Sequence, residues 1–197
     1  RGSLTGKLII FGLQGHVAYP SRANNPSTTI VNILKELKEI KFDKGTKDFQ
    51  PTNLEVTKIN INNTADNVIP ATAEATFNIR FNNKHSSNSL KKKLNKIFRK
   101  MTKKHKSKFK IEYRVSGEAF LTKPNKTTFM IQNIIKKITK LKPKLSTTGG
   151  TSDLRFIRTI CPGLEFGLVG KTMHKVDEAV SLKAVSYTHL TLPTMQV

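Results

Sequence analysis

The sequence predicts an α+β fold for residues 1–115, followed by part of an α/β domain in residues 116–184. Two observations support this prediction. Short segments that are apolar or alternate between apolar and polar residues are typical of strands, and longer segments with apolar residues every three or four positions are typical of helices. Over the first part these segments follow the order β-α-β-β-α-β. Beyond it the pattern changes, which indicates a second structural unit.

The first strand and the first helix are predicted in residues 6–40. Residues 6–15, GKLIIFGLQG, form an apolar run that is typical of a buried strand. Asn25 and Pro26 predict the start of a helix, because asparagine is a favoured N-cap and proline is favoured at the first helical position. The apolar residues that follow have helical spacing: Ile30, Ile33, Leu34, Leu37 and Ile40.

Two further strands, a helix and a last strand complete the first domain. Residues 52–62 alternate, but their apolar positions change parity after Val56, which predicts a β-bulge. Residues 74–81, EATFNIRF, alternate without a break and place Arg80 on the face opposite the phenylalanines. Residues 108–115 alternate again. The apolar stripe of the intervening helix contains Leu90, Leu94, Ile97 and Met101. This order is the ferredoxin-like unit, an antiparallel sheet with two helices on one face.

The second part is predicted as a portion of a larger α/β domain. Residues 125–140 have helical spacing, and the glycine pair of STTGGTSD predicts a tight turn, after which Thr151 or Ser152 can cap a short helix. Residues 163–170, GLEFGLVG, are predicted as a short buried strand. These elements cannot close a core by themselves. We therefore expect the remainder of the domain to lie before the first residue of this sequence.

The last residues, 185–197, break the pattern. The segment VSYTHLTLPTMQV lacks amphipathic helical spacing and the lysine-rich character of the rest. It resembles translated sequencing-adapter read-through at the end of an assembled gene fragment. We therefore treat it as a non-native tail and give His189 no weight.

The formal net charge is +22, with 35 basic and 13 acidic residues. A basic chain can bind phosphate backbones, but the lysines are scattered along the whole sequence. The densest block, residues 90–110, lacks the interleaved aromatic residues of a single-strand-binding groove. We therefore favour a solvated surface over a nucleic-acid partner. No run approaches the roughly 18 apolar residues of a membrane helix, and the single cysteine, Cys161, fits a reducing compartment, the cytoplasm.

Several polar residues could carry chemistry, and each also has a structural interpretation. His16, in QGHVAYP after the first strand, is more often a hydrogen-bonded structural residue than a catalyst when it is considered alone. Asn67 fits a β-turn, and Arg80 fits either a solvated side chain or a carboxylate-binding fork. TGGTSD offers a cradle of backbone N–H groups for an anion, without the lysine of a P-loop. His174 alone also favours a structural role.

Together and in this order, the motifs resemble those of one family. RGSLTGKL, QGHVAYP, NVIP, FNIRF, SGEAFLT, TGGTSD and HKVDEAVS are similar to segments of the succinyl-diaminopimelate desuccinylases, which belong to the di-zinc aminoacylase and carboxypeptidase clan. The resemblance covers about residues 1–183. It implies that residues 1–115 form a lid that carries the contact of a homodimer, and that residues 116–184 belong to a zinc-peptidase-like catalytic domain.

The resemblance also implies a reaction and a cofactor. The family hydrolyses N-succinyl-L,L-2,6-diaminopimelate, a small molecule of lysine biosynthesis, to succinate and L,L-diaminopimelate. Two zinc ions, which cobalt can replace, activate a water molecule, and a glutamate takes its proton. This sequence has Leu154, Gly170 and Asp177 where the family commonly has glycine, asparagine and asparagine. A sibling deacylase or dipeptidase, such as acetylornithine deacetylase, therefore remains an alternative, as does a basic nucleic-acid-binding module.

The resemblance assigns roles position by position. His174 matches the metal-binding histidine that follows the lid, and His16 matches the lid histidine that stabilises the oxyanion in the partner subunit's site. Arg1, at the start of the lid, is a further candidate. The matching substrate-binding positions are Asn67, Arg80, Gly150, Thr151, Ser116 and, as a lesser candidate, Tyr19. Zinc needs about three or four protein ligands, so we expect this chain alone to bind no pair of zinc ions and to show no turnover.

Overall fold

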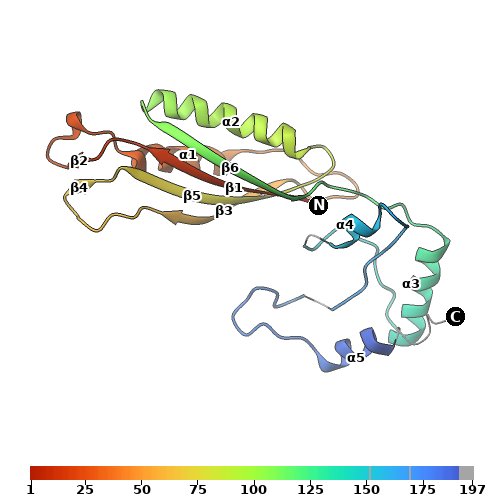
Figure 1. The fold of residues 1–197 in the computed structure, drawn as a ribbon. Coiled ribbons are helices and arrows are strands. Elements are labelled where there is room, and N and C mark those ends of the chain that lie inside the picture. The colour runs from red at the N-terminus through yellow and green to blue at the C-terminus, as the bar shows by residue number, and fades with distance from the viewer. Residues whose placement is uncertain (151, 169, 191–197) are drawn as a thin grey trace.

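The computed structural model describes residues 1–150, 152–168 and 170–190 (Figure 1). The chain forms an elongated sheet domain followed by a second part with three helices. The elements of the sheet domain are β1 (Gly2–Phe11), β2 (Gly15–His16), the 3-10 turn η1 (Pro20–Arg22), α1 (Pro26–Glu39), β3 (Asn53–Asn60), β4 (Val68–Ile69), β5 (Thr72–Phe81), α2 (Ser87–Lys104) and β6 (Lys108–Gly117). The second part contains α3 (Lys126–Thr139), α4 (Leu154–Ile157) and α5 (Leu182–Leu190).

The main sheet has four strands in the order β3-β5-β1-β6, and every neighbouring pair is antiparallel. Its register places Leu4 opposite Ile79 and Leu8 opposite Ala75. The alternation predicted for residues 74–81 is therefore the alternation of β5. The expected bulge in β3 is confirmed by a shift of register between Val56 and Lys58. This strand order, with its two crossing helices, confirms the predicted ferredoxin-like fold.

The core lies between one face of the sheet and the helices α1 and α2. Phe77, Phe81 and Phe98 are fully buried, and the ring centroids of Phe77 and Phe98 lie 6.3 Å apart. Gly6 is required beneath Phe77, because a Cβ at residue 6 would come within 2.3 Å of that ring. The large aromatic residues of β5 therefore pack directly across the backbone of β1.

The start of α1 follows the sequence prediction, since the side chain of Asn25 accepts a hydrogen bond from the backbone N–H of Ser27 at 2.9 Å. The same principle begins α3, where Asn125 and Thr128 form a reciprocal capping box. Caps of this type satisfy backbone N–H groups that have no partner inside the helix. Both helices therefore begin where the sequence places a capping residue.

One expectation for the second part is wrong. Residues 163–168 form no strand, and Phe166 and Leu168 are 44% and 49% exposed. A buried strand needs neighbours for its backbone N–H and C=O groups, and none of the residues described in the structure pairs with this segment. α5 spans Leu182–Leu190 and so includes the first residues of the segment 185–197.

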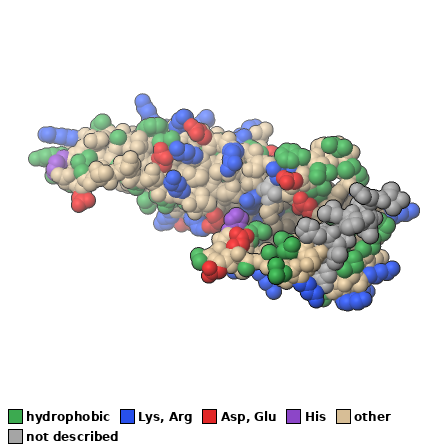
Figure 2. Space-filling view, turned by 60° about the horizontal axis from the view of Figure 1, so that its bottom comes forward, with side chains coloured by type: hydrophobic (Ala, Val, Ile, Leu, Met, Phe, Trp, Pro, Cys, Tyr) green, Lys and Arg blue, Asp and Glu red, His purple; other side chains and the backbone are tan. Residues whose placement is uncertain are grey.

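The surface differs between the two parts. Figure 2 shows basic side chains spread over the visible face of the sheet domain, rather than gathered in one patch. Large apolar side chains are more exposed in the second part, where Ile160 is 88% and Leu141 is 73% exposed. Among the described residues, no helix has the length and apolar character needed to cross a membrane.

Candidate active-site residues

His16 lies at the end of the sheet domain that points away from α3, α4 and α5, on the short pair of strands β2 and β4 (Figure 1). Its side chain is exposed. The backbone N–H of Ala18 donates a hydrogen bond to Nδ1 of His16 at 3.1 Å. A neutral imidazole that accepts at Nδ1 carries its proton at Nε2. The local backbone thus leaves Nε2 as the N–H donor of the ring.

Asn67 and Tyr19 lie next to His16. The backbone N–H of Val17 donates to the carbonyl oxygen of Asn67 at 3.0 Å, and the rings of His16 and Tyr19 have centroids 5.9 Å apart. The guanidinium of Arg22 lies over the Tyr19 ring, 5.2 Å from its centroid. We call His16, Tyr19 and Asn67 the tip cluster. The structure therefore brings together three of the residues that the sequence singled out.

Arg80 and Ser116 lie at the opposite end of the sheet. Arg80 pairs with Ser3 of β1 and with Asn53 of β3, and it is half-buried on the polar face. Ser116 lies where the register of β6 shifts, because Val115 faces Leu4 whereas Gly117 faces Ser3. Bulges of this type redirect a side chain and are common beside active sites.

Arg1 lies beside Arg80. Its guanidinium Nη1 donates to the side-chain oxygen of Asn53 at 3.1 Å. Burial lowers the pKa of Arg1, and the positive charge of Arg80 lowers it further. Two guanidinium groups that repel each other at a partly desolvated position form a site where an anion is favoured. We call Arg1, Arg80 and Ser116 the base cluster.

The tip cluster and the base cluster are separated by the length of the sheet. β5 runs from Thr72, near the tip, to Phe81, near the base. At about 3.3 Å per residue, a strand of this length spans roughly 30 Å. In this arrangement, one small molecule cannot contact both clusters of the same protomer.

Few neighbouring atoms hold the Gly149–Gly150 turn in place. Gly149 has φ +101°, a conformation that glycine adopts without strain, and no heavy atom lies near the position of a Cβ at Gly150. Just before the turn, the hydroxyl of Thr147 donates to the carbonyl oxygen of Asp48. Thr151, the other residue predicted at this turn, lies outside the described residues. The hydroxyl of Ser152 accepts from the backbone N–H of Leu154 at 3.0 Å, but the N-cap of α4 is Asp153, which makes no side-chain capping bond, so the cap expected at Thr151 or Ser152 is not the one observed.

His174 is exposed on a loop and has φ +60°. The loop is held by Thr172, whose hydroxyl donates to the carbonyl oxygen of Ala179 and accepts from its N–H, both at 2.9 Å. No three His, Cys, Asp or Glu side chains gather into a metal-binding group within residues 1–150, 152–168 and 170–190. A single imidazole does not meet the needs of zinc, so the side chains present do not fit a zinc site.

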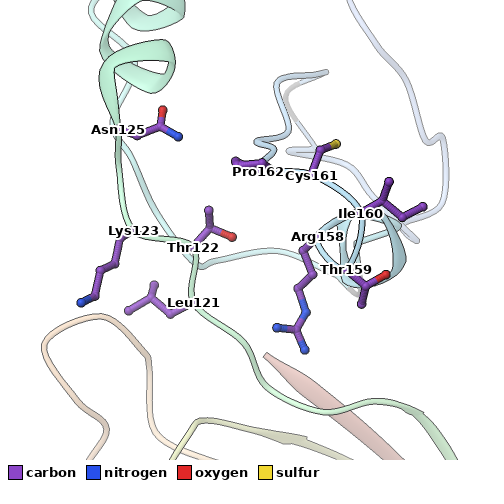
Figure 3. A pocket seen from close by; sticks show the side chains of 9 residues that line it. All are labelled: Leu121, Thr122, Lys123, Asn125, Arg158, Thr159, Ile160, Cys161 and Pro162. Atoms are coloured by element: carbon purple, nitrogen blue, oxygen red, sulfur yellow. The ribbon is translucent and has the colours of Figure 1, made fainter.

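An open hollow of about 410 Å³ lies between residues 121–125 and 158–162 (Figure 3). It contains none of the predicted site residues. Its two cationic side chains, Lys123 and Arg158, point in different directions, and Arg158 lies over the ring of Phe120. The lining groups do not converge on a common point, so the hollow is a weak candidate for a binding site.

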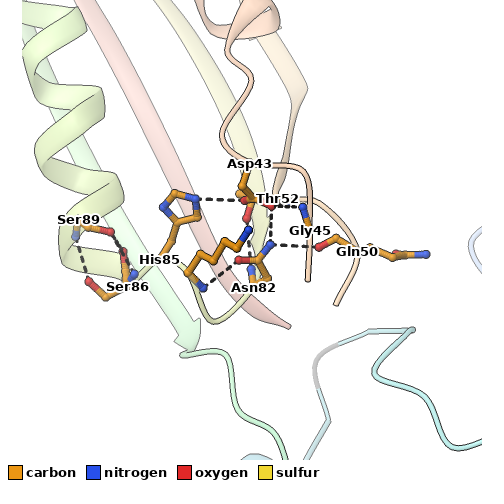
Figure 4. A network of polar contacts seen from close by, with 9 residues as sticks. Asp43, Gly45, Gln50, Thr52, Asn82, His85, Ser86 and Ser89 are labelled. Atoms are coloured by element: carbon orange, nitrogen blue, oxygen red, sulfur yellow. Dashed lines mark hydrogen bonds and ion pairs between the residues drawn. The ribbon is translucent and has the colours of Figure 1, made fainter. Parts of the chain in front are cut away.

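Asp43 is the centre of a polar network that the sequence analysis missed (Figure 4). Its carboxylate accepts from Asn82 Nδ2 at 2.7 Å and from the backbone N–H of Gly45 at 2.6 Å, and it lies 3.1 Å from His85 Nε2. Burial alone would raise the pKa of Asp43, but hydrogen bonds from Thr52, Gly45 and Asn82 outweigh it and lower the pKa to about 2. Asp43 followed by Gly45 was a usable sign of a turn.

Residues 1–106 match the family model of the peptidase dimerisation domain, which covers more than half of the chain. The chain therefore belongs to the peptidase dimerisation domain family, and the resemblance expected from the motifs is confirmed. Among curated proteins, it is 80% identical over 182 residues to the succinyl-diaminopimelate desuccinylase of Pelagibacter ubique, a match that covers 92% of this chain and 47% of that protein. It is 48% identical over 178 residues to the enzyme of the same name from Phenylobacterium zucineum, covering 90% of this chain and 47% of the relative.

The chain spans about half the length of the curated relatives that it matches. Solved structures show the same fold. A tripeptidase from Staphylococcus aureus has a TM-score of 0.74 at 17% identity and covers 94% of this chain and 48% of its own. The aminopeptidase PepT from Bacillus cereus has a TM-score of 0.70 at 16% identity and covers 95% of this chain and 49% of its own.

Proposed function

We propose that this chain is the lid and C-terminal part of a cytoplasmic, metal-dependent succinyl-diaminopimelate desuccinylase. The enzyme would hydrolyse N-succinyl-L,L-2,6-diaminopimelate to succinate and L,L-diaminopimelate. The observation that carries the proposal is the exposed ring of His16, whose Nδ1 accepts a hydrogen bond and leaves Nε2 as the donor, in a chain so similar to desuccinylases. The proposal depends on what this group and the base cluster can do chemically.

His16 would stabilise the oxyanion. Attack of water on an amide carbon places negative charge on the carbonyl oxygen, and an N–H donor aimed at that oxygen lowers the barrier. The hydrogen bond from the N–H of Ala18 fixes the tautomer with Nε2 protonated. The ring therefore needs no rearrangement before it can donate.

Arg80 and Arg1 would hold a carboxylate of the substrate. The succinyl group ends in a carboxylate, and a guanidinium fork binds a carboxylate through two parallel hydrogen bonds. An anion between the two arginines would also relieve the repulsion that contributes to the lowered pKa of Arg1. Ser116, Gly150 and Thr151 would add polar contacts from the catalytic side, and Asn67 and Tyr19 would add them from the tip.

The enzyme would act as a homodimer in which His16 serves the partner's site. The tip and base clusters of one chain lie roughly 30 Å apart along β5, too far for one substrate. In a two-fold dimer, the tip of one lid can lie over the catalytic part of the other protomer. Each active site would then combine residues from both chains.

A pair of zinc ions would supply a water nucleophile at neutral pH. His174 would contribute one ligand from its exposed loop. The other ligands and the general base would have to come from outside the described residues, because no further ligands gather there. The hydrolytic chemistry would therefore require more chain than these 197 residues.

The experiment that tests the proposal is expression of the full-length gene product, with its zinc, and assay on two substrates. We expect kcat/KM for N-succinyl-L,L-2,6-diaminopimelate to exceed that for N-acetylornithine by about a hundredfold or more, because a site that binds the succinyl carboxylate is left with unpaired polar groups by an acetyl group. Equal or better hydrolysis of N-acetylornithine would support a sibling deacetylase instead. Gly170, where the desuccinylases commonly have asparagine, is the feature that keeps this second candidate open.

A further inference from the structure

Loop 43–52 is held by hydrogen bonds at its base and along its length. At its base, the carboxylate of Asp43 accepts hydrogen bonds from the backbone N–H of Gly45 and from Asn82 Nδ2, as described above (Figure 4). Within the loop, the hydroxyl of Thr46 accepts from the backbone N–H of Phe49 at 3.0 Å, and Phe49 is 3% exposed. Gly45 has φ +83°, and a Cβ there would lie 2.8 Å from the carbonyl oxygen of Phe49. The loop therefore has a defined conformation that its own hydrogen bonds and the buried Phe49 support.

The loop contacts both regions that would bind substrate. At one end, Asn82 follows Arg80 by two residues, and its side chain donates to Asp43 and to the carbonyl oxygen of Gln50. At the tip of the loop, the carbonyl oxygen of Asp48 accepts from the hydroxyl of Thr147. Thr147 is partly buried, whereas Thr148, Gly149 and Gly150 are exposed. The hydrogen bond thus attaches an otherwise exposed turn to the lid.

We propose that loop 43–52 is a strut that sets the position of the Gly149–Gly150 turn relative to Arg80, with Thr147 as the positioning residue. This inference rests on the proposed function, which makes Gly150 and Arg80 substrate contacts. Asp43 anchors the strut to the end of β5, and Asp48 connects it to the turn. The spacing between the two contacts would then be set by the lid and not by the substrate.

The contact itself can be tested on the full chain by NMR. The carbonyl of Asp48 and the N–H of Phe49 belong to one peptide group, so loss of the hydrogen bond from Thr147 should shift the amide signal of Phe49. We expect Thr147→Val to move this signal, although residues 147 and 48 are 99 positions apart. The matched control is Thr148→Val, because the hydroxyl of Thr148 interacts with Ser146 inside the turn at 2.9 Å. An unmoved Phe49 signal in Thr147→Val would overturn the strut whatever the enzyme does.

The positioning role is tested by kinetics of the full-length gene product on N-succinyl-L,L-2,6-diaminopimelate. Thr147→Val should raise KM about three- to tenfold, the effect of one hydrogen bond, and leave kcat within about twofold. Thr148→Val should match the wild type. A fall in kcat with a lower melting temperature and an unchanged KM would make the contact merely structural and overturn the positioning role. If the wild-type enzyme does not hydrolyse this substrate, the proposed function and the positioning role fail, while the NMR result still decides whether the strut exists.

Discussion

The protonated atom of His16 is determined by a backbone amide. Because the N–H of Ala18 occupies Nδ1 at 3.1 Å, the proton of the neutral ring stays on Nε2. The hydrogen bond is local, so it forms before any substrate or partner is present. An oxyanion donor with this geometry costs no reorganisation when the reaction occurs.

His16→Ala in the full-length enzyme should lower kcat by about 10²–10³ and change KM little, because the lost interaction is made with the oxyanion and not with the ground state. Steady-state kinetics measures both values. Since the side chain is exposed, the melting temperature should stay that of the wild type. The matched control is Gln14→Ala, an exposed change on the same loop, which should have wild-type kcat. A wild-type kcat in His16→Ala would exclude the proposed role.

Arg80→Lys tests the guanidinium fork. A lysine keeps the charge but offers no two parallel hydrogen bonds to a carboxylate. We expect KM for the succinylated substrate to rise by about tenfold, together with the inhibition constant of free succinate. Arg114→Lys is the control, since Arg114 faces Thr5 in the same sheet and is exposed. If both variants bind substrate equally well, Arg80 does not hold a carboxylate.

At the level of elements, the Asp43 network joins loop 43–52 to the end of β5. The hydrogen bonds that lower the pKa of Asp43 to about 2, from 3.8, stabilise the folded state while the carboxyl is ionised. That stabilisation is complete above about pH 4 and is lost as the pH falls through the folded-state pKa. It amounts to about 2 kcal/mol.

Urea unfolding of the wild type and of Asp43→Asn between pH 6 and pH 2 checks this expectation. The free energy of unfolding of the wild type should fall by about 2 kcal/mol more than that of the variant over this range, because the variant lacks the titrating group. Other carboxylates titrate in both proteins and cancel in the difference. Parallel pH profiles would show that Asp43 is not stabilised in its ionised form.

The elements that the sequence predicted well are those with a periodic apolar pattern. α1 and β5 were predicted because each has an apolar stripe or face, and these residues form the core. The apolar stripe predicted for α2 was incomplete, because it included Ile97 but not Phe98, which is fully buried. The two-residue strands β2 and β4 are too short to produce any period. The segment 163–168 shows the reverse case, in which an apolar run remains unpaired for lack of a neighbouring strand.

The sequence named candidate site residues but not their arrangement in space. Motifs indicated His16, Asn67 and Arg80, yet nothing in the sequence shows that the first two lie together and the third lies at the far end of the sheet. That separation follows from strand pairing. The Asp43 network was not predicted for a similar reason, because Asn82 and His85 follow Asp43 by 39 and 42 positions in the sequence.

For the whole molecule, the separation of the clusters, together with the proposed function, predicts complementation between two inactive variants of the full-length enzyme. In a heterodimer of His16→Ala and His174→Ala subunits, one of the two sites contains both an intact His174 and an intact His16 from the partner. Mixing and refolding equal amounts should restore about a quarter of the wild-type activity, because half of the dimers are mixed and each has one complete site. Refolding either variant alone is the control. Activity that stays at the level of the variants alone would show that His16 acts within its own chain.

By itself, the 197-residue chain should bind zinc poorly. The described residues bring no three metal-binding side chains together, and a single imidazole holds a zinc ion weakly. Calorimetric titration of the full chain with zinc at pH 7 should show no high-affinity, stoichiometric binding, and His174→Ala should leave the titration unchanged. Tight binding of two zinc ions per chain would contradict the proposed division of the active site.

The length of β1 and β5 sets the distance between the two ends of the lid. They pair along their whole length, from Gly2 opposite Phe81 to Phe11 opposite Thr72. Removing two residues from each strand would preserve the inward and outward alternation but would shorten the pair by about 7 Å. Under the proposed function, the imidazole of His16 would then fall short of the partner's site. The proposed reach of His16 therefore depends on the number of residues in β1 and β5.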